Sequence, residues 1–206
     1  MMSEKERMLA GKLYIADDPK LIKDFKKARA LTRRFNNSTE EQTEYRKQLL
    51  QELFEATGEN IHIEPPFRCD YGNNITVGEN FYANFDCIIL DVCKVKIGQN
   101  VMFGPRVNIF TAGHPIDAEV RNTQLEYGKP VTIGDNVWVG GNVVINLGVS
   151  IGDNAVIGSG AVVTKDIPPN VVAVGNPCRI LREITAEDKN YWANQRAEYF
   201  AKIAHN

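Results

Sequence analysis

The strongest constraint on this chain is a six-residue period in its second half. Glycine recurs at the second position of these hexads and valine or alanine at the fifth. An amphipathic helix repeats every 3.6 residues and a strand every two, so neither produces a period of six. Aliphatic residues fill the first position of six consecutive hexads: Ile133, Val139, Ile145, Ile151, Ile157 and Val163.

This period is explained by a coiled chain with flat faces, in which each face is formed by about one hexad. Its aliphatic side chains point to the axis, one deeply buried in each hexad, and the backbone hydrogen bonds run between coils. Glycine and asparagine are expected at the corners, where the backbone is strained for other residues. We therefore predict a mainly β chain, with a solenoid of parallel strands over residues 59–184.

The first 58 residues have a helical pattern instead. Asp18 followed by Pro19 is a helix start signal, and the apolar residues behind it recur at spacings of three and four. A second helix is predicted from Ser38, which forms a capping box with Glu41, to the glycine at 58. The residues expected to face inward are Leu21, Phe25, Ala28, Leu31, Phe35, Leu49, Leu50, Leu53 and Phe54.

Residues 185–206 are predicted to form a C-terminal helix, because Thr185 and Asp188 match a capping box. Together with the N-terminal helices it is expected to cover the open ends of the solenoid. Trp192, Tyr199 and Phe200 are expected to be packing residues of this helix.

Composition narrows the class of protein. The formal net charge of −2 argues against a nucleic-acid surface. No apolar run is long enough to span a bilayer, and the charged start MMSEKERMLAGKL does not resemble a signal peptide, so we expect a cytoplasmic protein without membrane contact. The cysteines lack metal-ligand spacing and are expected to be small buried hydrophobes: Cys69, Cys87, Cys93 and Cys178.

The hexads break off over residues 111–130, a segment that begins TAGHP. This break, the hexads, the block PPFRCDYGNNITVGENFYANFDCIILD and the tail VVTKDIPPNVVAVGNPCRILREI together resemble the maltose and galactoside O-acetyltransferases of the hexapeptide acyltransferase superfamily. The resemblance implies a left-handed parallel β-helix that assembles as a homotrimer. It also implies an acetyl-CoA site between neighbouring subunits, with the extruded loop completing it, and no metal.

Acetyl transfer to a sugar hydroxyl needs a general base with a pKa near neutrality, and histidine is the natural choice. His114 lies between glycine and proline in the loop, whereas His62 lies at the start of the first coil and His205 is the penultimate residue. The resemblance makes Glu126 a candidate to orient His114, although a backbone carbonyl could do so and Glu126 could be a solvated carboxylate. It also points to the Gly141 N–H for the oxyanion, with direct transfer in a ternary complex and no acyl-enzyme.

The resemblance further assigns the two substrate sites. For coenzyme A it points to Gly141, Ser159, Thr164, Lys165, Arg179 and Arg182, with solvated surface charge as the alternative for the basic residues. For the acceptor it points to Asp17, Asp70, Asn84 and Asp91, where Asn84 and Asp91 could instead be coil corners and Asp17 could flank a helix cap.

The acceptor itself is expected to be a maltose- or glucose-type sugar or a galactoside. The galactoside enzymes carry serine where Asp70 stands and an acidic residue where Val92 stands, so the maltose type is favoured. Amino sugars and antibiotics remain open as other acceptors. Two further functions are weighed: a γ-type carbonic anhydrase, which needs three converging histidines, and a non-catalytic scaffold or binding solenoid, which needs no extruded histidine.

Overall fold

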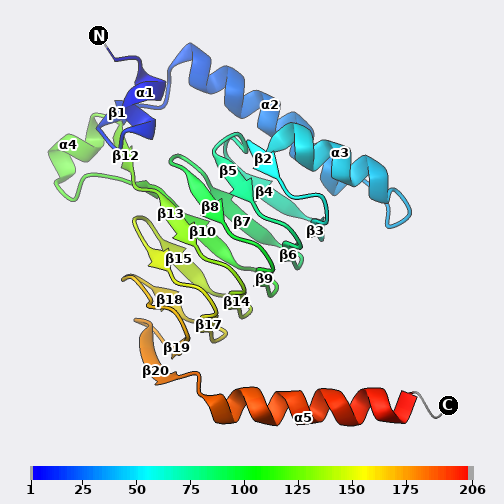
Figure 1. Ribbon diagram of the computed structural model, residues 1–206. Coiled ribbons are helices and arrows are strands. Elements are labelled where there is room, and N and C mark those ends of the chain that lie inside the picture. The colour runs from blue at the N-terminus through cyan, green and yellow to red at the C-terminus, as the bar shows by residue number, and fades with distance from the viewer. Residues whose placement is uncertain (1, 204–206) are drawn as a thin grey trace.

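The computed structural model describes residues 2–203 and contains the predicted left-handed parallel β-helix, shown in Figure 1. Three sheets form its faces. Face A consists of β4 (Phe67–Cys69), β7 (Cys87–Leu90), β10 (Asn108–Phe110), β15 (Val144–Asn146) and β18 (Val162–Val163). Face B consists of β2 (Ala56–Thr57), β5 (Ile75–Val77), β8 (Val95–Ile97), β13 (Val131–Ile133) and β16 (Ser150–Ile151). Face C consists of β3 (His62–Ile63), β6 (Tyr82–Ala83), β9 (Met102–Phe103), β14 (Trp138–Val139), β17 (Val156–Ile157), β19 (Val171–Val174) and the antiparallel β20 (Arg179–Glu183).

The core is a set of stacks that run along the coil axis. On face A, Ile109 lies opposite Ile89 and Ile145, and all three side chains are buried. Each hexad buries two residues rather than the one that we predicted. The fifth position is buried as fully as the first, as Val137 beside Ile133 shows, because the residue after each corner also points inward.

Two of the three edges of the coil turn in a regular way. The edge from face B to face C, here the asparagine edge, has a left-handed asparagine in each turn after the first, and neighbouring side-chain amides are joined by hydrogen bonds of 2.9–3.1 Å. Its members are Asn80, Asn100, Asn136, Asn154 and Asn170. The edge from face C to face A, here the mixed edge, has left-handed residues of several types: Asp86, Arg106, Asn142, Gly160 and Gly175.

The glycines at the second hexad position have a different role from the one predicted. Gly134 and Gly140 are not left-handed; the residues two positions later take the strained corner. A Cβ at Gly140 would lie 2.6 Å from the Ser159 nitrogen of the next coil. Glycine is therefore required here by the close approach of successive coils.

The third edge, from face A to face B, is irregular and is here called the arm edge. Its turns are residues 70–74, 91–94, 111–130, 147–149 and 164–166. The third of these is the extruded loop, here called the arm, which contains β11 (Ala112–Gly113), α4 (Ala118–Asn122) and β12 (Leu125–Gly128).

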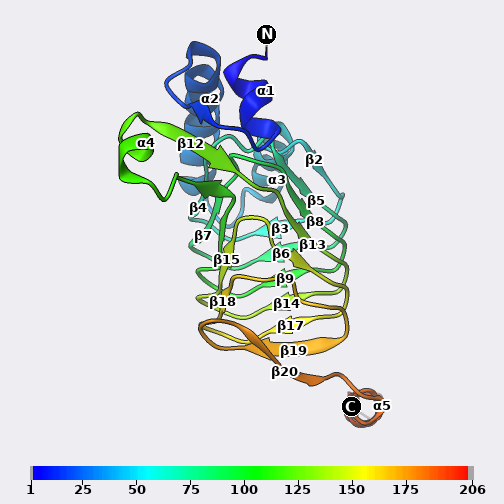
Figure 2. The ribbon, with the colours of Figure 1, turned by 90° about the vertical axis from the view of Figure 1, so that its left-hand side faces the viewer.

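The arm is held by the N-terminal segment of the chain. Strand β1 (Tyr14–Ile15) pairs with β12, which pairs with β11, so that the three form a small antiparallel sheet beside the N-terminal helices (Figure 2). At the root of the arm, the buried Thr111 hydroxyl donates to the Leu90 carbonyl at 2.7 Å and accepts the Cys93 N–H at 2.9 Å.

The helices α1 (Glu4–Leu9), α2 (Pro19–Asn36) and α3 (Thr43–Leu53) lie over the N-terminal end of the coil (Figure 1). The predicted start of α2 is confirmed, because Asp18 Oδ1 accepts the N–H groups of Lys20 and Leu21. All the residues predicted to face inward are buried except Phe25, which is exposed.

The predicted limits of α3 are wrong at both ends. The Ser38 hydroxyl donates to the Phe35 carbonyl of the preceding helix at 2.6 Å, so it makes no capping box with Glu41, and α3 begins only at Thr43. At the other end the chain leaves the helix after Leu53, because residues 56–57 already pair with β5 on face B.

Helix α5 (Ala186–Ile203) follows β20 and points away from the coil (Figure 1). Its predicted capping box is confirmed by hydrogen bonds between Thr185 and Asp188 in both directions. The prediction that its aromatic residues pack against this chain is wrong, since Trp192 is 67% exposed and Tyr199 and Phe200 about as much. The buried state of all four cysteines is confirmed, and no helix within residues 2–203 is long and apolar enough to cross a bilayer.

Candidate active site

The predicted site residues lie along both edges of face A. Asn84, Gly141 and Ser159 belong to turns of the mixed edge, where the strands of face A begin. Strands of three residues, about 10 Å long, separate these turns from the arm edge. The residues on the arm edge, where the same strands end, are Asp70, Asp91, His114, Glu126, Thr164 and Lys165.

His114 directly follows β11 and is exposed. The arm beyond it is ordered by Arg121, whose Nη1 donates to the carbonyls of Pro115 and Ile116 at 3.0 and 2.9 Å. His62, by contrast, is stacked on Tyr82 and lies 2.7 Å from a Glu64 carboxylate oxygen. His205 lies outside the described residues.

Glu126 contacts a residue that sequence reasoning did not single out. The Tyr14 hydroxyl donates to Glu126 Oε2 at 2.8 Å, and the two residues are opposite each other in the β1–β12 pair. Burial and this hydrogen bond raise the pKa of Tyr14, so its hydroxyl stays a donor. Between His114 and Glu126 there is no hydrogen bond in the described part of the chain.

A cavity of about 280 Å³ lies at the arm edge, between the N-terminal helices and the arm. Asp70 contributes a carboxylate to it and lies 3.5 Å from the Arg29 guanidinium. Burial raises the pKa of Asp70, and Arg29 opposes that rise. This arm-edge cavity is lined by Tyr14, Ala16, Leu21, Ile22, Phe25, Asp70, Tyr71, Val92 and Glu126.

Asp91 is not part of that lining. Its side chain is completely buried and accepts hydrogen bonds from the turn that follows β4, while the next residue, Val92, faces the cavity. Asp91 therefore lies behind the wall of this cavity, and a ligand in the cavity would not contact its carboxylate. Asp17 is exposed, and its neighbour Ala16 lines the cavity.

The mixed edge offers a row of small residues. The N–H groups of Gly140 and Asn142 donate to carbonyls of neighbouring coils, whereas the Gly141 N–H has no acceptor within residues 2–203. A Cβ at Gly160 would meet nothing within 4 Å, so this corner faces open space. Asn84 lies in the turn whose left-handed corner is Asp86, and its Oδ1 accepts the N–H of Phe85 at 2.8 Å.

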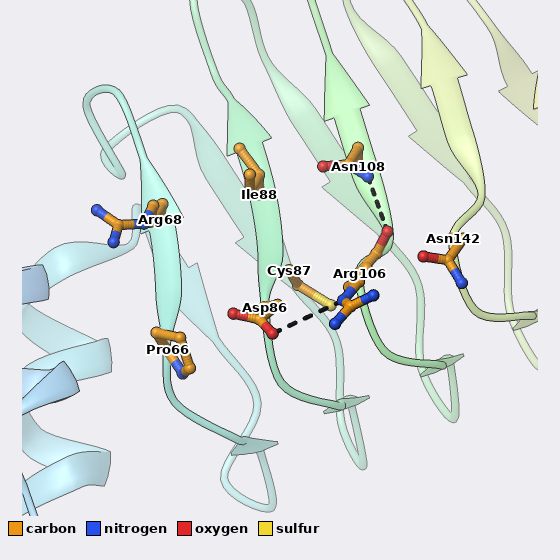
Figure 3. A pocket seen from close by; sticks show the side chains of 8 residues that line it. All are labelled: Pro66, Arg68, Asp86, Cys87, Ile88, Arg106, Asn108 and Asn142. Atoms are coloured by element: carbon orange, nitrogen blue, oxygen red, sulfur yellow. Dashed lines mark hydrogen bonds and ion pairs between the residues drawn. The ribbon is translucent and has the colours of Figure 1, made fainter.

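A second cavity, of about 290 Å³, lies over face A at the mixed edge (Figure 3). Its charged residues are Arg68, Asp86 and Arg106, and the Arg106 guanidinium lies 3.9 Å from the Asp86 carboxylate. Asn108 Nδ2 donates to the Arg106 carbonyl at 2.7 Å. Sequence reasoning missed both arginines; the available signal for Arg106 was an arginine at a corner position that elsewhere holds aspartate, asparagine or glycine.

The predicted cofactor residues of the tail are exposed, but they differ in their surroundings. Lys165 lies in a turn of the arm edge, and Arg179 Nη1 donates to the Cys178 carbonyl at 2.8 Å. Arg182 makes a two-pronged ion pair with Asp188, at 2.6 and 2.9 Å, and this pair lowers the pKa of Asp188 to about 2. Its guanidinium is therefore already engaged within this chain.

Comparison with known proteins gives consistent results. The maltose acetyltransferase hexapeptide capping motif matches residues 7–58, and the hexapeptide repeat of succinyl-transferase matches residues 130–165. The galactoside O-acetyltransferase of Escherichia coli is 48% identical over 93% of this chain and 94% of its own length. This chain belongs to the maltose and galactoside O-acetyltransferase family.

Other relatives cover the chain to a similar extent. Nodulation protein L of Rhizobium meliloti is 48% identical over 86% of this chain and 97% of its own length. A maltose O-acetyltransferase from Clostridium difficile 630 is 59% identical, with a TM-score of 0.89, over 89% of this chain and 98% of that structure. A galactoside acetyltransferase in complex with coenzyme A also has a TM-score of 0.89, at 48% identity over 92% and 94% of the two chains.

Membership of the family decides between the functions weighed above. The chain is an acetyl-CoA-dependent O-acetyltransferase, with acetyl-CoA as its co-substrate. The scaffold and the γ-type carbonic anhydrase are thereby set aside. Within residues 2–203 no three histidine, cysteine or acidic side chains are grouped as metal ligands.

Proposed function

We propose that this enzyme transfers the acetyl group to a hydroxyl of a maltose- or glucose-type sugar, with His114 as the general base. The observation that carries the proposal is the position of His114. It is exposed on an arm that two strand pairings hold in place, while His62 is engaged with Glu64 and Tyr82. An exposed imidazole in this position is free to contact a bound hydroxyl group, as a general base must.

The mixed edge suits the acetyl-CoA side of the reaction. Its small residues permit close approach of an extended ligand, and Gly160 leaves space beside the row. Arg179, which follows the last turn of this edge, offers exposed positive charge for phosphate groups, and Lys165 would offer it from the arm edge. Acetyl-CoA supplies an activated thioester, whose carbonyl carbon is the electrophile.

His114 would remove the proton of the sugar hydroxyl as the oxygen attacks that carbon. The unused Gly141 N–H would stabilise the negative charge that develops on the carbonyl oxygen. As the carbon–sulfur bond breaks, His114 would return the proton to the departing thiolate. No residue is acylated in this sequence, and the buried cysteines are not needed.

We further propose that the site is shared between subunits of a homotrimer. His114 and Gly141 lie at opposite edges of face A, so one chain does not bring them together. A neighbouring copy whose arm edge faces the mixed edge would do so. Sedimentation velocity should show a trimer, and a fully active monomer would contradict the shared site.

The arm-edge cavity suits a sugar acceptor. Carboxylates accept hydrogen bonds from hydroxyl groups, and aromatic rings cover the apolar face of a pyranose. Asp70, Glu126, Tyr14 and Tyr71 supply both kinds of group. The hydrogen bond from Tyr14 would hold the Glu126 carboxylate in place, and this carboxylate would bind or orient the acceptor.

A panel of mono- and disaccharides with acetyl-CoA and thiol detection tests the proposal. We expect sugar-dependent thiol release that is faster with maltose and glucose than with galactosides, as Asp70 and Val92 indicate. Thiol release that no sugar accelerates would overturn the proposal. A preference for galactosides would overturn the assignment of the maltose type.

A further inference from the structure

Asp91 is an acidic residue in an unusual environment. Its side chain is completely buried at the end of β7, and within residues 2–203 no basic side chain pairs with it. Its partners are backbone N–H groups. Oδ1 accepts those of Asp70 at 3.0 Å and Tyr71 at 2.9 Å, and Oδ2 accepts that of Asn74 at 3.4 Å.

The residues that donate these bonds form one short turn, 70–74, which wraps around the carboxylate. A further bond runs from Asn74 Nδ2 to the Asp91 carbonyl at 2.7 Å. The turn is confined from outside as well, since Gly72 is left-handed with φ 71° and a Cβ there would lie 2.6 Å from the Leu53 carbonyl oxygen. The conformation of the turn therefore depends on Asp91 at its centre.

This turn carries two residues that line the arm-edge cavity. The Asp70 side chain lies beside Arg29, and the Tyr71 ring packs edge-on against Phe25 at 6.5 Å between ring centroids. The two side chains leave the turn directly after the N–H groups that Asp91 holds. A change at Asp91 would thus move both cavity residues together.

We propose that Asp91 is a positioning residue for the acceptor, which sets sugar affinity by fixing Asp70 and Tyr71 without touching the sugar. This inference rests on the proposed function, because it takes the arm-edge cavity as the acceptor site. It explains why a charged side chain is buried where an apolar one would pack at lower cost: only a carboxylate can accept three N–H groups there.

Two opposing effects act on the charge of Asp91. Burial and the nearby Asp70 charge raise the pKa of Asp91, while the backbone N–H groups of Tyr71 and Asp70 lower it, leaving a value of about 7. The titratable groups around it are Cys69, Asp70 and Tyr71. The ionised form is the one in which every N–H of the turn has its acceptor.

The test is steady-state kinetics of Asp91→Asn, with maltose and acetyl-CoA varied separately. The asparagine amide has only one oxygen that can accept hydrogen bonds. Its NH₂ group would face a backbone N–H, which is also a donor, so the turn loses at least one of its hydrogen bonds to residue 91. We expect the KM for maltose to rise about tenfold, as the loss of one or two buried hydrogen bonds implies, with the KM for acetyl-CoA unchanged. The control is Asp153→Asn, which alters a carboxylate that accepts the Asp135 N–H in a distant turn, and neither KM should change.

An unchanged maltose KM in Asp91→Asn, or an equal rise for both substrates, would overturn the inference. If Asp91→Asn does not fold, as judged by circular dichroism, Asn74→Ala provides the second test. It removes the bond to the Asp91 carbonyl but keeps the carboxylate, and it must also raise the maltose KM selectively. A wild-type enzyme with no sugar-dependent thiol release would instead overturn the proposed function, and this inference with it.

Discussion

The asparagine edge and the arm edge join the same kinds of strand, yet they are built in opposite ways. Each turn of the asparagine edge after the first repeats the same structure, a left-handed asparagine bonded to the asparagines of neighbouring coils. Each turn of the arm edge is different. The arm is held in place by contacts between residues distant in sequence, such as the hydrogen bond from Tyr14 to Glu126. The regular edge maintains the coil, and the irregular edge is free to carry a site.

The two edges should therefore respond differently to substitution. A change on the arm edge should affect catalysis or acceptor affinity and leave the coil intact. A change on the asparagine edge should affect stability and leave the kinetic constants of the remaining folded enzyme intact. The mixed edge lies between them, since it is regular but leaves the Gly141 N–H unused.

The largest effect is expected for His114→Ala on the arm. It should lower kcat by about 10²-fold or more, because a general base contributes on that order, with acetyl-CoA affinity nearly unchanged. The kcat is measured by the rate of thiol release, and the acetyl-CoA affinity by calorimetric titration. His62→Ala is the matched control and should retain activity; near wild-type turnover of His114→Ala would refute the assignment.

The next effect concerns the other substrate. Arg179→Ala should raise the KM for acetyl-CoA about tenfold, as expected for a charged hydrogen bond to phosphate, and spare the sugar. Added salt should weaken acetyl-CoA binding in the wild type more than in the variant. Lys189→Ala, which removes a charge from α5, serves as the control. An acetyl-CoA KM equal to that of the wild type would remove Arg179 from the cofactor site.

On the asparagine edge we expect an effect on stability alone. Asn136→Ala should lower the free energy of unfolding by about 1 kcal/mol more than Asn136→Gly, because alanine pays for the left-handed backbone and glycine does not. Both variants lose the amide bonds to Asn100 and Asn154. Urea unfolding measures the difference. Equal stability of the two variants would show that the left-handed backbone is not what asparagine is needed for.

A smaller change is expected for Tyr14→Phe, which removes one hydroxyl from the arm-edge cavity. Losing its hydrogen bond to Glu126 should raise the sugar KM about threefold. The acetyl-CoA KM should stay constant in the same titrations. Tyr45→Phe is the control, since the Tyr45 hydroxyl also makes a side-chain hydrogen bond, which it accepts from Arg34 at the surface. A loss of acetyl-CoA affinity in Tyr14→Phe would show that the cavity serves the other substrate.

A separate expected effect is a pH dependence of stability, which changes no kinetic constant at a fixed pH. Because Asp91 has a pKa of about 7 in the fold against an ordinary 3.8, the native state holds its proton more tightly than the unfolded chain. Its contribution to stability is therefore greatest at low pH and is lost as pH rises from about 4 to about 7. The stability of the wild type relative to Asp91→Asn should fall over that range in urea unfolding. A relative stability that rises with pH would show that the N–H groups dominate over burial.

The regular parts of the molecule could be predicted from the sequence because each is specified locally. Ile133 and its successors repeat at the period of the coil, and Asp18 with Pro19 starts α2 from adjacent residues. The N-terminal anchoring of the arm could not be predicted in this way, because Tyr14 and Glu126 are 112 residues apart in sequence.

Local signals also failed where a tertiary contact competed with them. Ser38 has the neighbours of a capping residue, but its hydroxyl donates to Phe35 of the preceding helix. Asp91 was recognised as an important acidic residue, yet its burial behind the cavity depends on the fold of the 70–74 turn. The exposed aromatic face of α5 follows from no pattern in its own sequence.

If acetyl-CoA binds as proposed, the mixed edge fixes the distance between the two ends of its site. The turns are stacked at the spacing of neighbouring strands, about 4.8 Å, so the coils between Gly141 and β20 would set the reach from the reacting carbonyl to Arg179. Adding or deleting one coil would change that reach by one strand spacing and leave each turn intact. A solenoid of this kind can therefore match extended ligands of different lengths by a change in its number of coils, with the contacts within each turn kept.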